Sequence, residues 1–163
     1  MPKRRSTVTM TKAEVQQMLR TTRDLQVTSI GLNGWPHMVT MWFAVDDDGV
    51  IEFSTYTKSQ KVLNLQRDPR ITVLVADGTV YSELRGVSIE GTAEVVTDPQ
   101  QVADGMARVG RKNGDGSGPP GQVMSANGGH APITPQATKR SLIRVHPQRV
   151  RTWDHTKLPA GVH

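Results

Sequence analysis

The stretch "IEFSTYTKSQKVLNLQRDPRITVLVA", residues 51–76, is the segment from which the fold of this chain is best predicted. It begins with β-branched and aromatic residues, which are typical of a strand. It ends with an almost wholly apolar run, residues 71–76, which predicts a second strand covered on both faces. Between the two, apolar residues recur at helical spacing from Lys58 to about Gln66, and Pro69 ends that pattern. The segment is therefore predicted to be strand, short helix, strand.

The start of this short helix carries a concentration of positive charge. Thr57 and Gln60 have the spacing of a capping box, in which a hydroxyl accepts from a first-turn amide and the glutamine reaches back. Lys58 and Lys61 lie in the same turn, although the helix macrodipole already makes a helix N-terminus positive. Either both ammonium groups are simply solvated, or they converge with the free amides on an anion such as a phosphate.

Similar patterns on both sides of this segment predict the rest of the fold. Asn33-Gly34 lies between two strand-like runs and favours a hairpin turn, and Pro36 suits the start of the second strand. A long alternating stretch, about residues 81–96, predicts one strand with Gly86 and Gly91 as points of bulging or close approach. Further elements are a helix over 11–23 with a Thr11–Glu14 capping box, a helix from Asp98-Pro99 to about Gly110, and a last strand over 141–153 bent at Pro147.

Six or so antiparallel strands with a few short helices predict a mainly β, α+β fold, a closed or nearly closed barrel. With 163 residues the chain suits one domain, expected over residues 11–157. Residues 1–10 are predicted to be a disordered tail and residues 158–163 a C-terminal tail. Residues 111–136 are dense in Gly and Pro and lack periodicity, so they are predicted to be an inserted loop.

Composition excludes several classes of function. Cysteine is absent, so no disulfide, thiolate metal site or cysteine nucleophile is possible, and no histidine pairing suggests a metal site. The net charge of +5 suits anionic partners, but aromatic residues are only 4% of the chain, so a nucleic-acid partner is not expected. No apolar run approaches a membrane span, which leads us to expect a cytoplasmic protein. No acid–base pair stands out either, so a cofactor would carry any chemistry.

Taken together, these segments resemble the pyridoxamine 5′-phosphate oxidase-like split β-barrel superfamily over about residues 11–110 and 139–157. The resemblance is strongest in "KSQKVLNLQRDPRITVLV" after "IEFST", and it extends to "GWPHMVTMWFAV" and "GVSIEGTAEVV". The form K-x-x-N-L-x-R-D-P-R from Lys61 and the ending "RTWDHTKL" look most like the actinobacterial branch that uses coenzyme F420, a 5-deazaflavin. This resemblance implies a split β-barrel that is dimeric.

The resemblance also implies where a cofactor binds. Relatives hold it in a groove between the two subunits of a homodimer, with the phosphate at the strand-to-helix turn and the ring against the second strand of the hairpin. Asn64 either contacts the cofactor or only holds the turn together, and Met41 either faces the ring or packs in the core. The implied cofactor-binding residues are Lys61, Lys58, Ser59, Gln60, Ser54, Thr40, Met41, Trp42 and Asn64.

A small-molecule substrate pocket is expected near the chain's last strand. Trp153 and His155 either close this pocket or belong to an exposed tail, and Tyr81 and Arg85 lie where an anionic cofactor tail would want positive charge. The expected function is an F420-dependent reductase that transfers a hydride from the reduced deazaflavin C5 atom to an electron-poor double bond. The alternatives are an FMN-binding oxidase or flavin reductase, and a non-catalytic protein that binds F420, flavin or haem. No catalytic residue is assigned.

Overall fold

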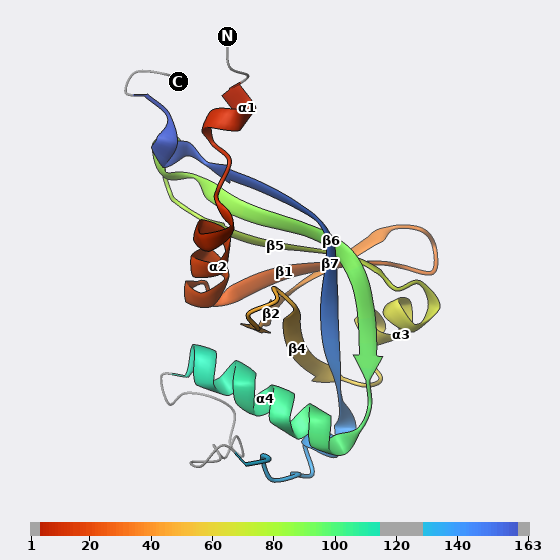
Figure 1. Cartoon of the computed structure of the whole chain (residues 1–163). Coiled ribbons are helices and arrows are strands. Elements are labelled where there is room, and N and C mark those ends of the chain that lie inside the picture. Colours follow the sequence, from red (N-terminus) through yellow and green to blue (C-terminus); the bar gives the residue numbers. More distant parts are fainter. Residues whose placement is uncertain (1–3, 115–128, 160–163) are drawn as a thin grey trace.

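The computed structural model describes residues 4–114 and 129–159. Its seven strands are β1 (Asp24–Ile30), β2 (Pro36–Trp42), β3 (Ala44–Val45), β4 (Ile51–Tyr56), β5 (Arg70–Asp77), β6 (Arg85–Val96) and β7 (Arg140–Asp154). They form one antiparallel sheet in the order β2-β1-β5-β6-β7-β4-β3. The long strands β6 and β7 bend sharply and belong to both halves of a split barrel (Figure 1). The mainly β split-barrel fold that the sequence predicts is confirmed.

Four α-helices and three 3₁₀ turns complete the described chain. The α-helices are α1 (Arg4–Thr7), α2 (Lys12–Thr21), α3 (Gln60–Arg67) and α4 (Pro99–Asn113), and the 3₁₀ turns are η1 (Tyr81–Glu83), η2 (Ala137–Lys139) and η3 (His155–Lys157). The Thr11–Glu14 capping box at the start of α2 is confirmed, and Asp98 caps α4 by accepting from the Gln101 amide. No helix within the described ranges has the length and apolar character needed to cross a bilayer.

The sheet bends at Gly91 and Pro147, where the sequence predicts a bulge or close approach and a bent strand. The register between β6 and β7 shifts between Glu90 and Gly91, opposite Pro147. A side chain at Gly91 would lie 2.5 Å from the His146 carbonyl oxygen, so only glycine permits this approach of the two strands. Gly34 supplies the positive φ of the β1–β2 hairpin turn, as its sequence predicts.

Alternate residues of the strands point into one apolar core inside the barrel. Its largest fully buried side chains include Phe43, Phe53, Leu25 and Ile51. α2 packs against this core through Met18 and Leu19. α4 instead packs on the outside of the β4–β7 half, against Leu142. The barrel thus has an apolar core inside and is covered by α4 on one of its outer faces.

The prediction that the 71–76 strand is covered on both faces is wrong. Ile71, Val73 and Val75 are buried, but Thr72 is exposed and Leu74 is only half-buried. Within the described residues no helix lies over that outer face, because α2 packs on the inner side and α4 covers the other half of the sheet. One face of β5 is therefore open in a single copy of the chain.

Two predicted boundaries also change. Residues 4–10 are not simply a disordered tail, because α1 forms and Met10 is buried against the core. α4 continues past Gly110 to Asn113, whose buried side-chain amide donates to the Phe43 and Val109 carbonyls. Of the predicted 111–136 loop, residues 115–128 lie outside the described residues. The remainder returns to α4, where Ala131 is buried.

Candidate functional site

The start of α3 has no side-chain cap. The helix begins at Gln60 after Ser59, whose side chain makes no capping hydrogen bond. The predicted Thr57–Gln60 capping box is wrong, because the Thr57 hydroxyl bonds to Ser141 Oγ at 2.9 Å and its amide donates to the Lys139 carbonyl. These bonds extend the pairing between β4 and β7 and delay the helix. The first-turn amides of α3 consequently have no side-chain acceptor.

Lys61 is held over the end of β4. Its ammonium donates to Thr55 Oγ1 at 2.9 Å, and the same hydroxyl lies 3.4 Å from Ser59 Oγ. Burial lowers the pKa of Lys61, and the positive charge of Arg140 lowers it further. An anion that approaches such a lysine stabilises its charged form.

Arg140 lies beside Lys61 and is a residue that the sequence patterns do not single out. It is paired with Tyr56 across the β4–β7 ladder, and its guanidinium lies 4.4 Å from the centre of the Tyr56 ring. One Nη donates to the Ser54 carbonyl at 3.5 Å, whereas Nε is buried without a hydrogen-bond partner. No carboxylate among residues 4–114 and 129–159 forms an ion pair with Lys61 or Arg140. The two cations are therefore uncompensated, and they fit an anionic group.

Of the other residues predicted at this turn, one is exposed to solvent and one is buried beneath it. Lys58 is exposed at the same turn. Asn64 is fully buried, accepts from the Gln60 side chain at 2.8 Å and donates to Ser29 Oγ at 3.0 Å. Of the two roles considered for Asn64, the structure supports holding the turn: it ties α3 to β1.

The strand predicted to lie against a cofactor ring presents two different faces. Thr40 and Trp42 share the face on which Met38 is 64% exposed. Met41 lies on the other face and packs against the barrel core. Of the two roles considered for Met41, core packing is therefore the one that the structure supports. The guanidinium of Arg23 lies 5.2 Å from the centre of the Trp42 ring, which fixes this side chain at the end of β2.

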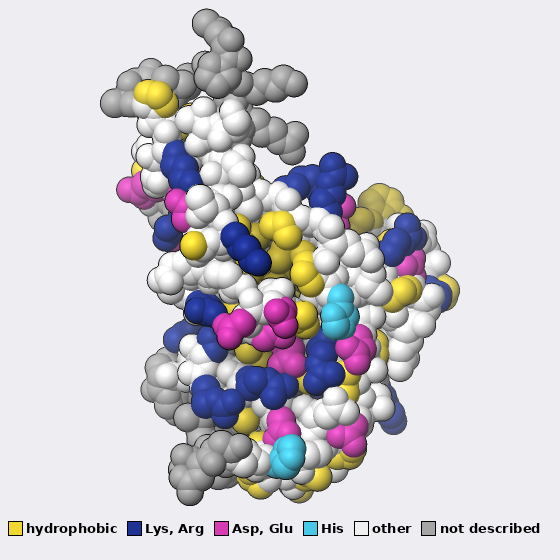
Figure 2. Space-filling view, viewed as in Figure 1, with side chains coloured by type: hydrophobic (Ala, Val, Ile, Leu, Met, Phe, Trp, Pro, Cys, Tyr) yellow, Lys and Arg dark blue, Asp and Glu magenta, His cyan; other side chains and the backbone are white. Residues whose placement is uncertain are grey.

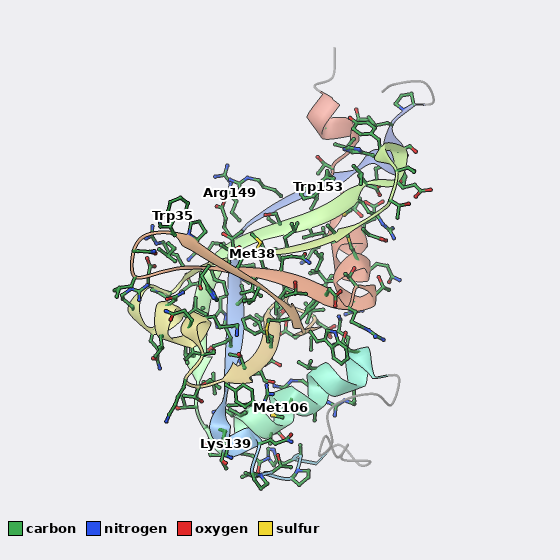
Figure 3. All side chains as sticks on the ribbon, turned by 180° about the vertical axis from the view of Figure 1, so that it is seen from behind. Trp35, Met38, Met106, Lys139, Arg149 and Trp153 are labelled. Atoms are coloured by element: carbon green, nitrogen blue, oxygen red, sulfur yellow. The ribbon has the colours of Figure 1, made fainter. Side chains whose placement is uncertain are left out.

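The four residues predicted to form a substrate pocket come together far from Lys61. The Tyr81 and His155 rings lie 4.6 Å apart, and His155 Nδ1 is 2.8 Å from the Tyr81 carbonyl. Trp153 packs over Gly86, and Arg85 pairs with Asp77 at 2.7 Å. This group lies at one end of β7 and Arg140 at the other, as Trp153 and Lys139 show in Figure 3.

The geometry is that of a phosphate-binding turn on a curved sheet. Uncapped helix amides, the Ser59 and Thr55 hydroxyls and two uncompensated cations are the groups that proteins use for a phosphate. No side chain in this cluster is a nucleophile activated by a base, so the cluster is suited to binding and not to covalent catalysis.

The sequence matches the pyridoxamine 5′-phosphate oxidase family over residues 11–154. A conserved hypothetical protein from Mycobacterium tuberculosis, Rv2991, has a similar structure with a TM-score of 0.80 and 34% identity, covering 99% of this chain and 96% of that one. An F420 reductase has a TM-score of 0.63 and 21% identity, covering 83% and 94%. A FAD-binding protein from Mesorhizobium loti has a TM-score of 0.64 and 17% identity, covering 88% and 94%. The comparison with curated protein sequences yielded no match.

Proposed function

Because the chain belongs to the pyridoxamine 5′-phosphate oxidase family, we propose that it is a coenzyme F420-dependent oxidoreductase that acts on a small molecule. The observation that carries this proposal is the uncompensated pair of Lys61 and Arg140 beside the uncapped start of α3. A phosphorylated cofactor supplies the missing negative charge. Members of the split-barrel fold include a protein described as an F420 reductase, which supports the choice of cofactor.

The chain's own residues bind and orient the cofactor. Lys61, Arg140 and the Ser59 hydroxyl hold the phosphate, and Lys58 adds positive charge from the exposed side of the turn. The outer face of β2, with Thr40 and Trp42, is the surface against which we place the ring. When bound, the reduced deazaflavin would supply a hydride from C5 to an electron-poor double bond, with the proton that completes the reduction taken from water. The protein contributes position and electrostatics, and no nucleophile is required.

A homodimer is part of this proposal. The outer face of the sheet carries Met38 and the exposed Thr72, and no helix among the described residues covers it. A second copy lying on this face would form a groove with the β2 surface. It would also bring the Tyr81–His155 end of one subunit toward the Lys61 turn of its partner, which a single chain keeps apart. This arrangement would reunite the two groups of predicted residues around one small-molecule substrate.

The test is a parallel binding titration with F420 and with FMN, using the wild-type chain and Lys61→Ala. We expect F420 to bind at least tenfold more tightly than FMN (about 1.4 kcal/mol) and Lys61→Ala to lose about tenfold or more in affinity. Lys12, exposed at the start of α2, provides the matched control, and Lys12→Ala should bind as the wild type does.

The possible results of this titration distinguish the alternative functions. A preference for FMN would replace the deazaflavin proposal with a flavin oxidase or flavin reductase of the same fold. Binding of F420 without turnover of enones, quinones or tetrapyrroles would indicate a carrier. Failure of both cofactors to bind would refute the site at α3.

A further inference from the structure

A second cationic hollow lies on another part of the molecule. It has a volume of about 790 Å³ and lies between α4, α2 and the strands β3 and β4, and none of its described lining residues belongs to α3. Figure 2 shows dark-blue Lys and Arg side chains gathered on the lower half of the face that carries α4. The cations that line the hollow are Arg20, Arg108, Arg111, Lys112 and Arg144.

Two carboxylates line the same hollow, and each accepts hydrogen bonds from groups other than Arg111 and Lys112. Glu52 accepts from Arg108 at 2.7 Å and from Arg144 at 3.0 Å. Asp46 accepts from the backbone amides of Asp48 and Val50 and so closes its own turn. Arg20 pairs outside the hollow lining, with the exposed Asp47. Neither lining carboxylate therefore forms an ion pair with Arg111 or Lys112.

Lys112 is a half-buried cation of this hollow that has no carboxylate partner among the described residues. Its ammonium donates to the Thr22 carbonyl and lies 3.6 Å from the centre of the Phe43 ring. Within the described parts of the chain it has no carboxylate partner, and neither does the exposed Arg111. Burial lowers the pKa of Lys112 to about 8. A half-buried ammonium paired only with a carbonyl and a ring is costly without a counter-ion.

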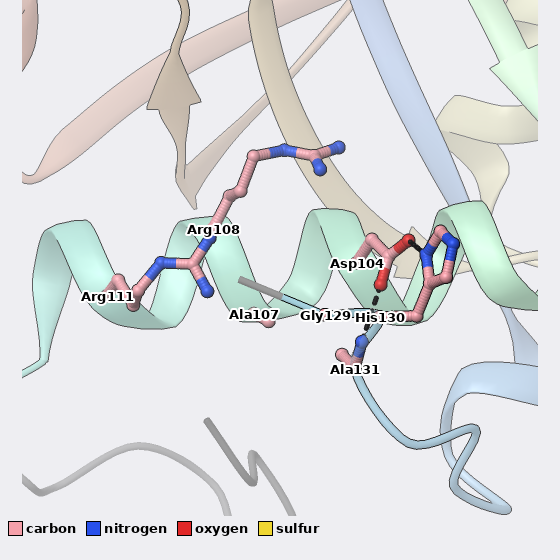
Figure 4. A pocket seen from close by; sticks show the side chains of 7 residues that line it. All are labelled: Asp104, Ala107, Arg108, Arg111, Gly129, His130 and Ala131. Atoms are coloured by element: carbon pink, nitrogen blue, oxygen red, sulfur yellow. Dashed lines mark hydrogen bonds and ion pairs between the residues drawn. The ribbon is translucent and has the colours of Figure 1, made fainter. Parts of the chain in front are cut away.

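The cations on α4 have the spacing needed to bind neighbouring anionic groups. Arg111 and Lys112 follow Arg108 by three and four residues, which places each of them beside Arg108 on the helix surface at about 5–6 Å between Cβ atoms, and all three line the hollow. Arg108 and Arg111 also border a neighbouring hollow of about 590 Å³ between α4 and residues 129–131 (Figure 4). There Asp104 is held at 2.7 Å by both His130 and the Ala131 amide, and it forms no ion pair with either arginine among the described residues.

We propose that the hollow lined by Arg111 and Lys112 binds a small polyanion, a molecule with two or more phosphate or carboxylate groups. Guanidinium groups bind either group through paired hydrogen bonds, and a pocket of several hundred Å³ is the size of a small-molecule site. The site is separate from the α3 turn and does not depend on the proposed function. Its ligand stabilises the conformation in which α4 lies over β3 and β4.

The test is calorimetric titration of the full chain at low and at moderate salt. Inorganic triphosphate probes for a phosphate ligand and citrate for a carboxylate ligand. The variants are Arg111→Ala and Lys112→Met in the hollow, Lys61→Ala at the α3 turn, and Lys12→Ala as a charge-matched surface control. We expect one probe to bind at the hollow, and the affinity of this binding event should fall tenfold or more in Arg111→Ala and Lys112→Met and less than twofold in Lys61→Ala and Lys12→Ala. A second binding event that only Lys61→Ala removes belongs to the α3 turn.

Each other outcome overturns the proposal. If neither probe binds, the hollow is a solvated basic surface. If Lys12→Ala weakens binding as much as Arg111→Ala, the attraction is that of net charge. If only Lys61→Ala abolishes binding, the probe occupies the α3 turn. Because Arg111 is exposed, Arg111→Ala is expected to fold, and it tests the site independently of the half-buried Lys112.

Discussion

Lys61 and Arg140 bring two positive charges to the end of β4, where burial and mutual repulsion both disfavour the charged lysine. Proteins keep such a pair at a cost in stability, and a bound phosphate removes that cost. Lys61 can be identified from the sequence because it lies in the same turn as Lys58. Arg140 cannot, because it lies 79 residues further along the chain (140 − 61) and reaches the turn only through the β4–β7 register.

Arg140 is therefore the residue on which the cofactor site is most sharply tested. Arg140→Gln should reduce affinity for the phosphorylated cofactor about tenfold, or ~1.4 kcal/mol, because a charge-assisted hydrogen bond is lost. The pKa of Lys61 should rise at the same time, since one cause of its depression is removed. Cofactor titration measures the first effect and lysine NMR the second. The exposed neighbour Lys139 gives the control, and an equal loss in Lys139→Gln would show that the effect is not specific.

Lys112 predicts a pH dependence of stability. Its pKa falls from the ordinary lysine value of 10.5 to about 8 in the folded protein, so between these values the unfolded chain binds more protons than the native one. The contribution of Lys112 to the free energy of unfolding therefore rises with pH between about 8 and 10.5. Below pH 8 both states are charged and the folded state bears the cost of burial. The charged groups facing it are Arg20, Arg108, Arg111, Arg144, Asp46 and Glu52.

Lys112→Met removes this titration. We expect the variant to be more stable than the wild type by roughly 1–2 kcal/mol near neutral pH, a value discounted for the partial exposure of the side chain. The advantage should shrink as pH rises from about 8 toward 10.5, because the lysine of the folded wild type is then increasingly neutral and no longer bears the cost of a buried charge. Urea unfolding near pH 7 and near pH 10 measures the difference, with Lys12→Met as the exposed control. A difference that is independent of pH would contradict the prediction.

The helices and strands show which parts of the fold are encoded locally. Alternation and turn residues predict all the long strands, because side-chain period and glycine conformation depend on near neighbours. The start of α3 is predicted incorrectly, because the Thr57 hydroxyl that would cap the helix is taken by Ser141, a residue distant in the sequence. A capping pattern cannot reveal that competition. The exposed side of β5 is not predicted for the same reason, since coverage depends on where α2 and α4 pack.

α4 depends on one close approach to the sheet. A side chain at Gly105 would lie 2.4 Å from Leu142 Cδ1, and Leu142 is fully buried. Gly105→Ala gains about 1 kcal/mol of helix propensity but forces the helix away from β7, so we expect a net loss of roughly 1–2 kcal/mol. Adding Leu142→Val should recover part of the loss by making room. Thermal unfolding of the two single variants and the double variant measures the coupling, and simple additivity would count against this contact.

At the scale of the whole molecule, the curvature of β6 and β7 divides the outside of the sheet into two faces, which differ in whether a helix covers them. α4 covers the face formed by β4 and the start of β7, and the described residues leave the face of β2, β1 and β5 open. Met38 is 64% exposed and Trp35, at the hairpin turn beside it, is 74% exposed. Figure 3 shows both labels on that side of the sheet. Their exposure in one copy is what the proposed homodimer explains.

The dimer is tested by placing a charge on that face. Met38→Asp buries a carboxylate if the face is an interface, so we expect it to shift the chain from dimer to monomer. Light scattering with size-exclusion chromatography measures the mass. Ile133→Asp is the matched control, because Ile133 is also exposed, at 50%, but belongs to the segment between Ala131 and η2, which both pack against α4. Cofactor affinity should fall in Met38→Asp although the Lys61 turn is unchanged, since half of the groove would be missing. A monomeric wild type with full affinity would show that one copy of the chain forms the whole site. A Met38→Asp dimer with full affinity would show that this face is not the interface.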